Sequence, residues 1–215
     1  MNTRTLAALF LFLAVATGCV DNNASVRLSA ACFPPTPNDD GSCSYPSTCD
    51  SVMQGNLWVD TTYAPTGGTL YWPFQADNQR PDNGDRSGGT NTATAFVTGF
   101  KISYRSTAVS IPTVTVKNTT RTVESTGSTV LSIPVIPPNV ATLLAVNPIL
   151  LAEVLAEIRA TGHYADGQSF ETGPFTVVVN VTNGNGSGVF CPDPAAPTPI
   201  GVCPQPGQSG VQLCK

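Results

Sequence analysis

Alternation of apolar and polar residues limits the fold of this chain more than any other feature. Between residues 96 and 105, Phe96, Thr98, Phe100, Ile102 and Tyr104 alternate with Val97, Gly99, Lys101, Ser103 and Arg105. A period of two is that of a half-buried β-strand, so we expect the face that starts at Phe96 to meet a core. Residues 70–77 repeat the pattern, with Leu70, Trp72, Phe74 and Ala76 on one face. Pro73 cannot donate a ladder hydrogen bond, which predicts an edge strand or a bulge there.

Further strands are predicted at residues 57–59, 114–116, 131–135 and 175–181, which are rich in Val, Ile and Leu. Residues 148–164 fit both helical and strand spacing. Asp166-Gly167 follows and is a strong hairpin signal. We therefore predict a strand over 152–164, with a short helix at 139–151 that begins after Pro138.

Composition agrees with an all-β domain outside the cytoplasm. Only 11% of residues are charged, and turn-forming Gly and Pro each number 19. Seven predicted strands within residues 51–190 indicate an immunoglobulin-like antiparallel β-sandwich of about seven strands. No cysteine lies between Cys49 and Cys191, so the disulfide that links the sheets of true immunoglobulin domains is absent. The formal net charge of −4, without a basic patch, excludes nucleic acid as a partner.

The N-terminus has the three parts of a secretory signal. Arg4 precedes an apolar run from Leu6 to Ala16, and small residues follow the run. The run is too short to span a hydrocarbon core of about 30 Å as a helix. We expect residues 1–18 to be a signal peptide.

Ala16-Thr17-Gly18-Cys19 resembles the lipobox of bacterial lipoproteins. The resemblance implies cleavage before Cys19, diacylglycerol on its thiol and an acyl chain such as palmitate on its freed amine. These chains would hold the protein on a membrane. Ala16 departs from the Leu usual in this family, and ordinary cleavage with a spare thiol is the alternative. Val20 suggests the outer membrane or cell surface; the other locations considered are secreted and periplasmic.

The cysteine count supports lipidation. Setting Cys19 aside leaves an even number, which suits disulfides in an oxidising compartment: Cys32, Cys43, Cys49, Cys191, Cys203 and Cys214. Three precede the sandwich and three follow it, so complete pairing needs at least one bridge between the two sets. Residues 19–50 are predicted to be a lipid-anchored tether with a Cys-rich loop, and 191–215 a Cys/Pro/Gly-rich tail. The twelve residues 20–31 would reach about 40 Å.

No motif in the chain indicates catalysis. His163 is the single histidine, and its place on the outer face of a predicted strand favours a surface residue over a catalytic or zinc-binding one. The carboxylates are too scattered to nominate a pair, and the cysteines lack zinc-site spacing. We therefore expect no enzyme activity, no cofactor and no resident metal.

Two groups of residues are candidate ligand sites. Residues 77–85, which include Asp77, Asp82 and Asp85, are rich in oxygen ligands, but lack EF-hand spacing. A solvated connection is favoured over a structural Ca²⁺ site. Trp58 and Tyr71 would bind a sugar or a protein if they faced outward. Coverage of both strand faces is the favoured alternative.

Three stretches carry a wider resemblance. They are residues 70–104, residues 157–191 and the tail pattern Cys203-Pro204-Gln205-Pro206-Gly207-Gln208. Together they resemble uncharacterised lipoproteins of myxobacterial and related deltaproteobacterial type. Ser209 stands where Asp is expected. The resemblance implies a compartment and a fold, and no activity. We expect a non-enzymatic envelope or surface protein with a structural or protein-binding role; the alternative is a carbohydrate- or calcium-dependent adhesion module.

Overall fold

The computed structural model of the chain describes residues 25–33, 39, 48–49, 52, 57–60, 70–82, 91–146, 151–182, 199–201 and 212–214. Its strands are β1 (Val26–Ala31), β2 (Leu57–Asp60), β3 (Leu70–Asn78), β4 (Ala95–Ser106), β5 (Val114–Val123), β6 (Ser128–Ile136), β7 (Leu151–Tyr164), β8 (Ser169–Glu171), β9 (Phe175–Thr182), β10 (Pro199–Gly201) and β11 (Gln212–Cys214). One helix, α2 (Pro138–Ala145), lies between β6 and β7.

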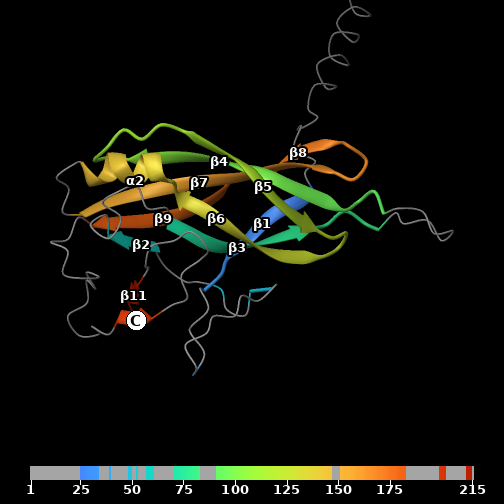
Figure 1. Ribbon diagram of the computed structural model, residues 1–215, viewed down its shortest axis with the longest axis horizontal. Coiled ribbons are helices and arrows are strands. Elements are labelled where there is room, and N and C mark those ends of the chain that lie inside the picture. Colours follow the sequence, from blue (N-terminus) through green and yellow to red (C-terminus); the bar gives the residue numbers. More distant parts are fainter. Residues whose placement is uncertain are drawn as a thin grey trace, which may run out of the picture.

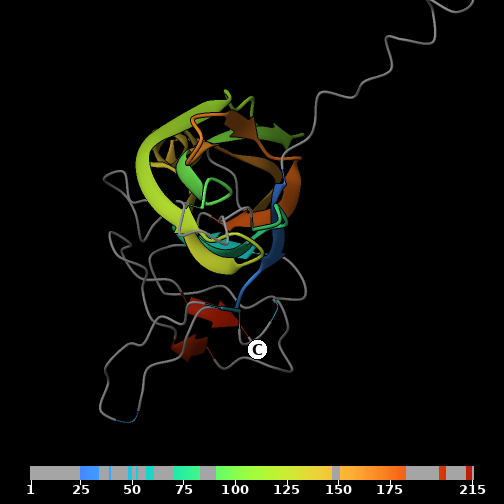
Figure 2. The same cartoon turned by 90° about the vertical axis from the view of Figure 1, so that its right-hand side faces the viewer.

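Two sheets pack against each other, which confirms the predicted all-β sandwich. The three-stranded sheet has the order β1-β3-β6, and the six-stranded sheet has the order β2-β9-β7-β4-β5, with β8 beside β7. Figure 1 shows the two layers from the side, and Figure 2 shows them from one end around a common interior. One pairing departs from the antiparallel prediction, because β2 runs parallel to β9. β10 and β11 pair in a separate two-stranded sheet.

The core lies between the sheets and consists of the side chains that alternation predicts to face inward. The fully buried residues include Trp72, Phe74, Phe100, Ile102, Leu131, Ile133 and Ile158. Burial of each such side chain contributes about 1.5–3 kcal/mol, so this interior holds the two sheets together.

β1 corrects the predicted domain boundary. The sequence predicts a tether over residues 19–50, but residues 26–31 pair antiparallel with β3 from Val26 opposite Asn78 to Ala31 opposite Phe74. Val26 and Leu28 are buried in the core, and beyond the register shift between Leu28 and Ala30 it is Ala31 that packs against the core. The sandwich therefore begins well before residue 51, and the tether is shorter than predicted.

β3 is the central strand of its sheet, so the predicted edge position is wrong. The sheet accepts Pro73 because the proline lies opposite Cys32, one position beyond the last β1–β3 pair, where its carbonyl still accepts from the N–H of Cys32. The register with β1 shifts between Leu28 and Ala30, and the register with β6 shifts between Leu70 and Tyr71. Both irregularities flank the proline instead of falling on it.

A bulge in β4 reverses the predicted face of Phe96. The register of β4 with both neighbours shifts between Val97 and Gly99. An extra residue moves the following side chains to the opposite face. Val97 is therefore fully buried, whereas Phe96 is only half-buried and stacks on His163 with a ring-centroid distance of 5.4 Å. His163 itself is exposed, as predicted.

The segment between β6 and β9 follows its prediction closely. α2 begins at Pro138, ends at Ala145 and buries Val140, Ala141 and Leu144. β7 then fills the predicted strand, and the Asp166-Gly167 turn joins it to β8 with Gly167 at φ 86°. Within the described residues, no helix has the length and apolar character needed to cross a bilayer.

Candidate functional site

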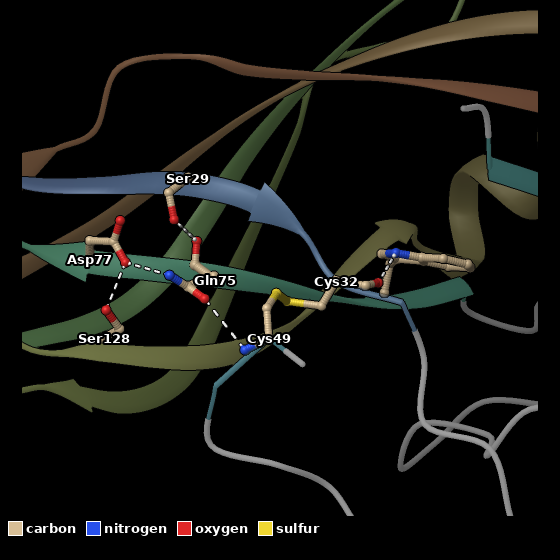
Figure 3. The surroundings of a disulfide bond; sticks show 7 residues. Ser29, Cys32, Cys49, Gln75, Asp77 and Ser128 are labelled. Atoms are coloured by element: carbon tan, nitrogen blue, oxygen red, sulfur yellow. Dashed lines mark hydrogen bonds between the residues drawn. A yellow bond between two sulfur atoms is a disulfide. The ribbon is translucent and has the colours of Figure 1, made fainter. Parts of the chain in front are cut away.

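The described cysteines include one disulfide. Cys32 and Cys49 are bonded, with their Cα atoms 5.3 Å apart, beside the outer face of β3 (Figure 3). Cys19, Cys43, Cys191 and Cys203 lie outside the described residues, and Cys214 ends β11. With Cys32 and Cys49 joined, Cys43 is the member of the N-terminal set left for the predicted bridge to the C-terminal set.

Asp77 belongs to a polar cluster on the outer face of the three-stranded sheet. One carboxylate oxygen accepts hydrogen bonds from Gln75 at 2.9 Å and Ser128 at 2.8 Å, as Figure 3 shows. The other lies 3.5 Å from Nε of Arg27. Burial works to raise the pKa of Asp77, but the hydrogen bonds from Gln75, Ser128 and Ser29 and the charge of Arg27 outweigh it. The pKa is therefore lowered.

Among the described residues of this loop, none joins Asp77 in a metal site. Asn78 is buried, and its side-chain amide N–H groups donate to the carbonyls of Ala93 and Val123. These hydrogen bonds link the end of β3 to the start of β4 and the end of β5. Asp82 is exposed, and Asp85 lies outside the described residues. In the part of the chain that the structure describes, no three His, Cys, Asp or Glu side chains gather closely enough to hold a metal ion.

Trp58 and Tyr71, the aromatic side chains weighed as ligand contacts, lie on different sheets. Trp58 lies in β2, the edge of the six-stranded sheet, and its side chain is outside the described set. Tyr71 is half-buried in β3, opposite Pro134 of β6. Trp58 and Tyr71 therefore do not lie on paired strands of one sheet.

A row of charges crosses the outer face of the six-stranded sheet. Glu157 lies 3.1 Å from Arg159 and 3.5 Å from Arg105. Glu171 lies 3.8 Å from Arg159 and 4.0 Å from Lys101. Cations and carboxylates alternate along this row, so the charges on this face largely satisfy one another. Exposed pairs of this kind contribute only about 0–1 kcal/mol each to stability.

The edge of the same sheet opposite β2 is formed by β5, and its charges differ from those of the row. We call Val114–Val123 the β5 edge. β5 pairs with β4 on one side, and no described strand pairs with it on the other. Its charged residues, Lys117 and Arg121, are exposed and make no ion pair with any described residue.

This edge is the candidate site, and sequence reasoning found only part of it. The alternation at 114–116 predicts a strand, but it does not say whether that strand is central or at an edge. Unpaired backbone groups on an edge strand are a template for another extended chain. Comparison of the chain with protein-family models, with curated proteins and with solved structures finds no match.

Proposed function

We propose that this protein is a lipid-anchored, non-enzymatic envelope protein that binds an extended, acidic segment of another envelope protein along the β5 edge. The observation that carries the proposal is the open edge of β5 with its two cations, Lys117 and Arg121. A strand added there would form main-chain hydrogen bonds for affinity and side-chain contacts for specificity.

The charge of the edge supports an acidic partner over a second copy of this chain. The register shift places Lys117, opposite Gly99, and Arg121, opposite Val97, on opposite faces of β5. A second β5 edge would add its own two cations beside these, and like charges in cross-strand positions destabilise pairing. Glu or Asp on the incoming strand would instead meet two cations that have no ion-pair partner among the described residues. The same pair of charges thus attracts one class of partner and repels another.

Hydrogen exchange with designed peptides tests this proposal. Two peptides of equal length and β-propensity are compared, one alternating Val with Glu and the other alternating Val with Lys. The Glu peptide should slow exchange of amides in Val114–Val123, and the Lys peptide should not. Protection elsewhere but not in β5, or equal protection by both peptides, would overturn the β5 assignment.

A charge-reversed variant is the matched control. Lys117→Glu combined with Arg121→Glu should exchange the preference, so that the Lys peptide protects β5. Both side chains are exposed, so the fold should persist, and a circular dichroism spectrum checks this. Loss of binding to both peptides in a folded variant would count against charge selection.

The lipid anchor is tested separately by intact mass of the membrane-extracted protein. The resemblance at Ala16–Cys19 implies cleavage before Cys19 and added acyl mass on that residue. A Cys19→Ser variant should lose the acyl mass and leave the membrane fraction. A mature mass without lipid would instead indicate a secreted or periplasmic protein.

A further inference from the structure

We infer that the end of the sandwich where β1 begins faces the membrane and that the end carrying α2 faces away from it; the inference rests on the proposed lipid anchor. We call the first end the anchor pole and define it by Ser25, residues 79–82, residues 124–127 and residues 165–168. Figure 1 shows β8, which follows the last of these turns, at one end of the sandwich and α2 at the other.

The chain is fastened to the anchor pole as soon as it enters the described fold. The backbone N–H of Ser25 donates to the hydroxyl of Tyr164 at 3.1 Å. The carbonyl of Ser25 accepts from the N–H of Gln79 at 2.8 Å, and Val26 then pairs with Asn78. The ends of β7 and β3 therefore hold this residue, and the chain that leads to Cys19 starts from this pole.

The covalent distance from Cys19 to Ser25 is short compared with the sandwich. Six residue steps reach at most about 20 Å when fully extended. The twelve residues of β4 run from Ala95 near the anchor pole to Ser106 at the far end and span about 40 Å. An acylated Cys19 therefore keeps the anchor pole near the bilayer surface and leaves the far end free to project.

The described turn residues that define the anchor pole give it no net positive charge to attract anionic lipid. Arg80 is the one cation among the described turn residues of this pole, which also include Asp82, Glu124 and Asp166. Its guanidinium lies 2.7 Å from Asp166 and 4.4 Å from the centroid of the Tyr164 ring. The cation is thus already engaged, and the tether must impose the orientation.

The charge row on the outer face of the six-stranded sheet also offers no unpaired cations that would hold this face flat against an anionic bilayer. Its cations, Lys101, Arg105 and Arg159, are paired with Glu157 and Glu171. With the anchor pole at the surface, the β5 edge runs away from the bilayer. An extended segment of a partner protein could then approach the β5 edge from the aqueous side, away from the bilayer.

Energy transfer to a headgroup-labelled lipid tests the orientation. A fluorescent amino acid replaces Gln168 at the anchor pole or Ala108 at the far end, in acylated protein reconstituted into vesicles. Both side chains are exposed, and both residues use backbone atoms for their hydrogen bonds. Transfer from position 168 should exceed transfer from position 108 several-fold. Equal transfer, or stronger transfer from 108, in protein with confirmed acyl mass would overturn the inference.

Two controls separate this inference from its premise. Insertion of about 20 Gly/Ser residues after Val20 should reduce the difference between the two positions, because a long flexible linker removes the constraint. An unchanged ratio would show that the tether does not set the orientation. Protein without acyl mass that fails to float with vesicles would overturn the anchor itself, whatever the β5 edge binds. Cys19→Ser protein that binds anionic vesicles at low salt would contradict the charge argument.

Discussion

The indole N–H of Trp72 donates to the carbonyl of Cys32 at 3.0 Å, within the buried interior beside the disulfide. On the same rung, the backbone N–H of Cys32 donates to the carbonyl of Pro73 at 2.9 Å. An antiparallel rung normally exchanges two such bonds, but Pro73 has no N–H. The side chain of Trp72 therefore satisfies the acceptor that the proline leaves open.

Trp72→Phe should reduce the free energy of unfolding by about 1–3 kcal/mol beyond the effect of lost apolar area, because the Cys32 carbonyl would be buried without a donor. Urea unfolding measures the loss. A double-mutant cycle isolates the hydrogen bond: Pro73→Ala restores a backbone N–H on this rung, so Trp72→Phe should cost less in that background. Strictly additive effects would contradict the proposed substitution of one donor for another.

Tyr104 joins the two sheets through a single hydrogen bond. Its hydroxyl donates to the carbonyl of Val135 at 2.9 Å, and Val135 falls where the β3–β6 register shifts. Tyr104→Phe should cost about 1–3 kcal/mol, because it removes the donor and leaves the carbonyl buried. Thermal or urea unfolding at neutral pH measures this. An unchanged stability would mean that another group satisfies Val135.

Burial raises the pKa of Tyr104 above its ordinary value of 10.0. The folded state therefore retains this proton more strongly than the unfolded chain does. The resulting stability is fully present below the unfolded pKa, and it is lost as the pH rises toward the folded one. Unfolding free energy should fall less steeply above about pH 10 in Tyr104→Phe than in the native protein. Equal slopes in the two proteins would remove Tyr104 from the alkaline transition.

The contribution of Asp77 to the free energy of unfolding should decrease at acidic pH. Its folded pKa is lowered below the ordinary 3.8, so its contribution is present above that value and is lost as the pH falls through the folded pKa. Asp77→Asn should flatten the acid limb of a stability–pH profile while keeping the fold at neutral pH. An acid limb identical to that of the native protein would show that other carboxylates carry the dependence.

Gly99 lets β4 and β5 approach at the bulge. A Cβ atom at residue 99 would lie 2.5 Å from the Val116 carbonyl oxygen, closer than real Cβ atoms come to a backbone atom. Gly99→Ala should destabilise the protein by about 1–3 kcal/mol or more through overpacking. Gly173→Ala is the matched control, because nothing lies within 4 Å of its Cβ position. Equal stability of the two variants would contradict the close approach.

Alternation along the chain was enough to predict much of the sandwich. The inward faces of β3, β7 and β9 and the Asp166-Gly167 turn were correct, because a period of two and a turn sequence are local properties. The strand at 26–31 carries the same signal only in Val26 and Leu28, because the register shift after Leu28 turns Ala31 toward the core. Two residues beside a proline-rich loop are too short a run to predict a strand.

The candidate site depended on contacts between residues far apart in the sequence. Pairing between strands decides whether β5 is an edge and whether Asp77 is open to a ligand. One bulge decides whether Phe96 faces the core. The sequence by itself determined that the chain forms strands with a buried face, since that follows from each residue's neighbours. Only the tertiary structure decided which edge and which end stay open, because a strand's hydrogen bonds are completed by residues distant along the chain.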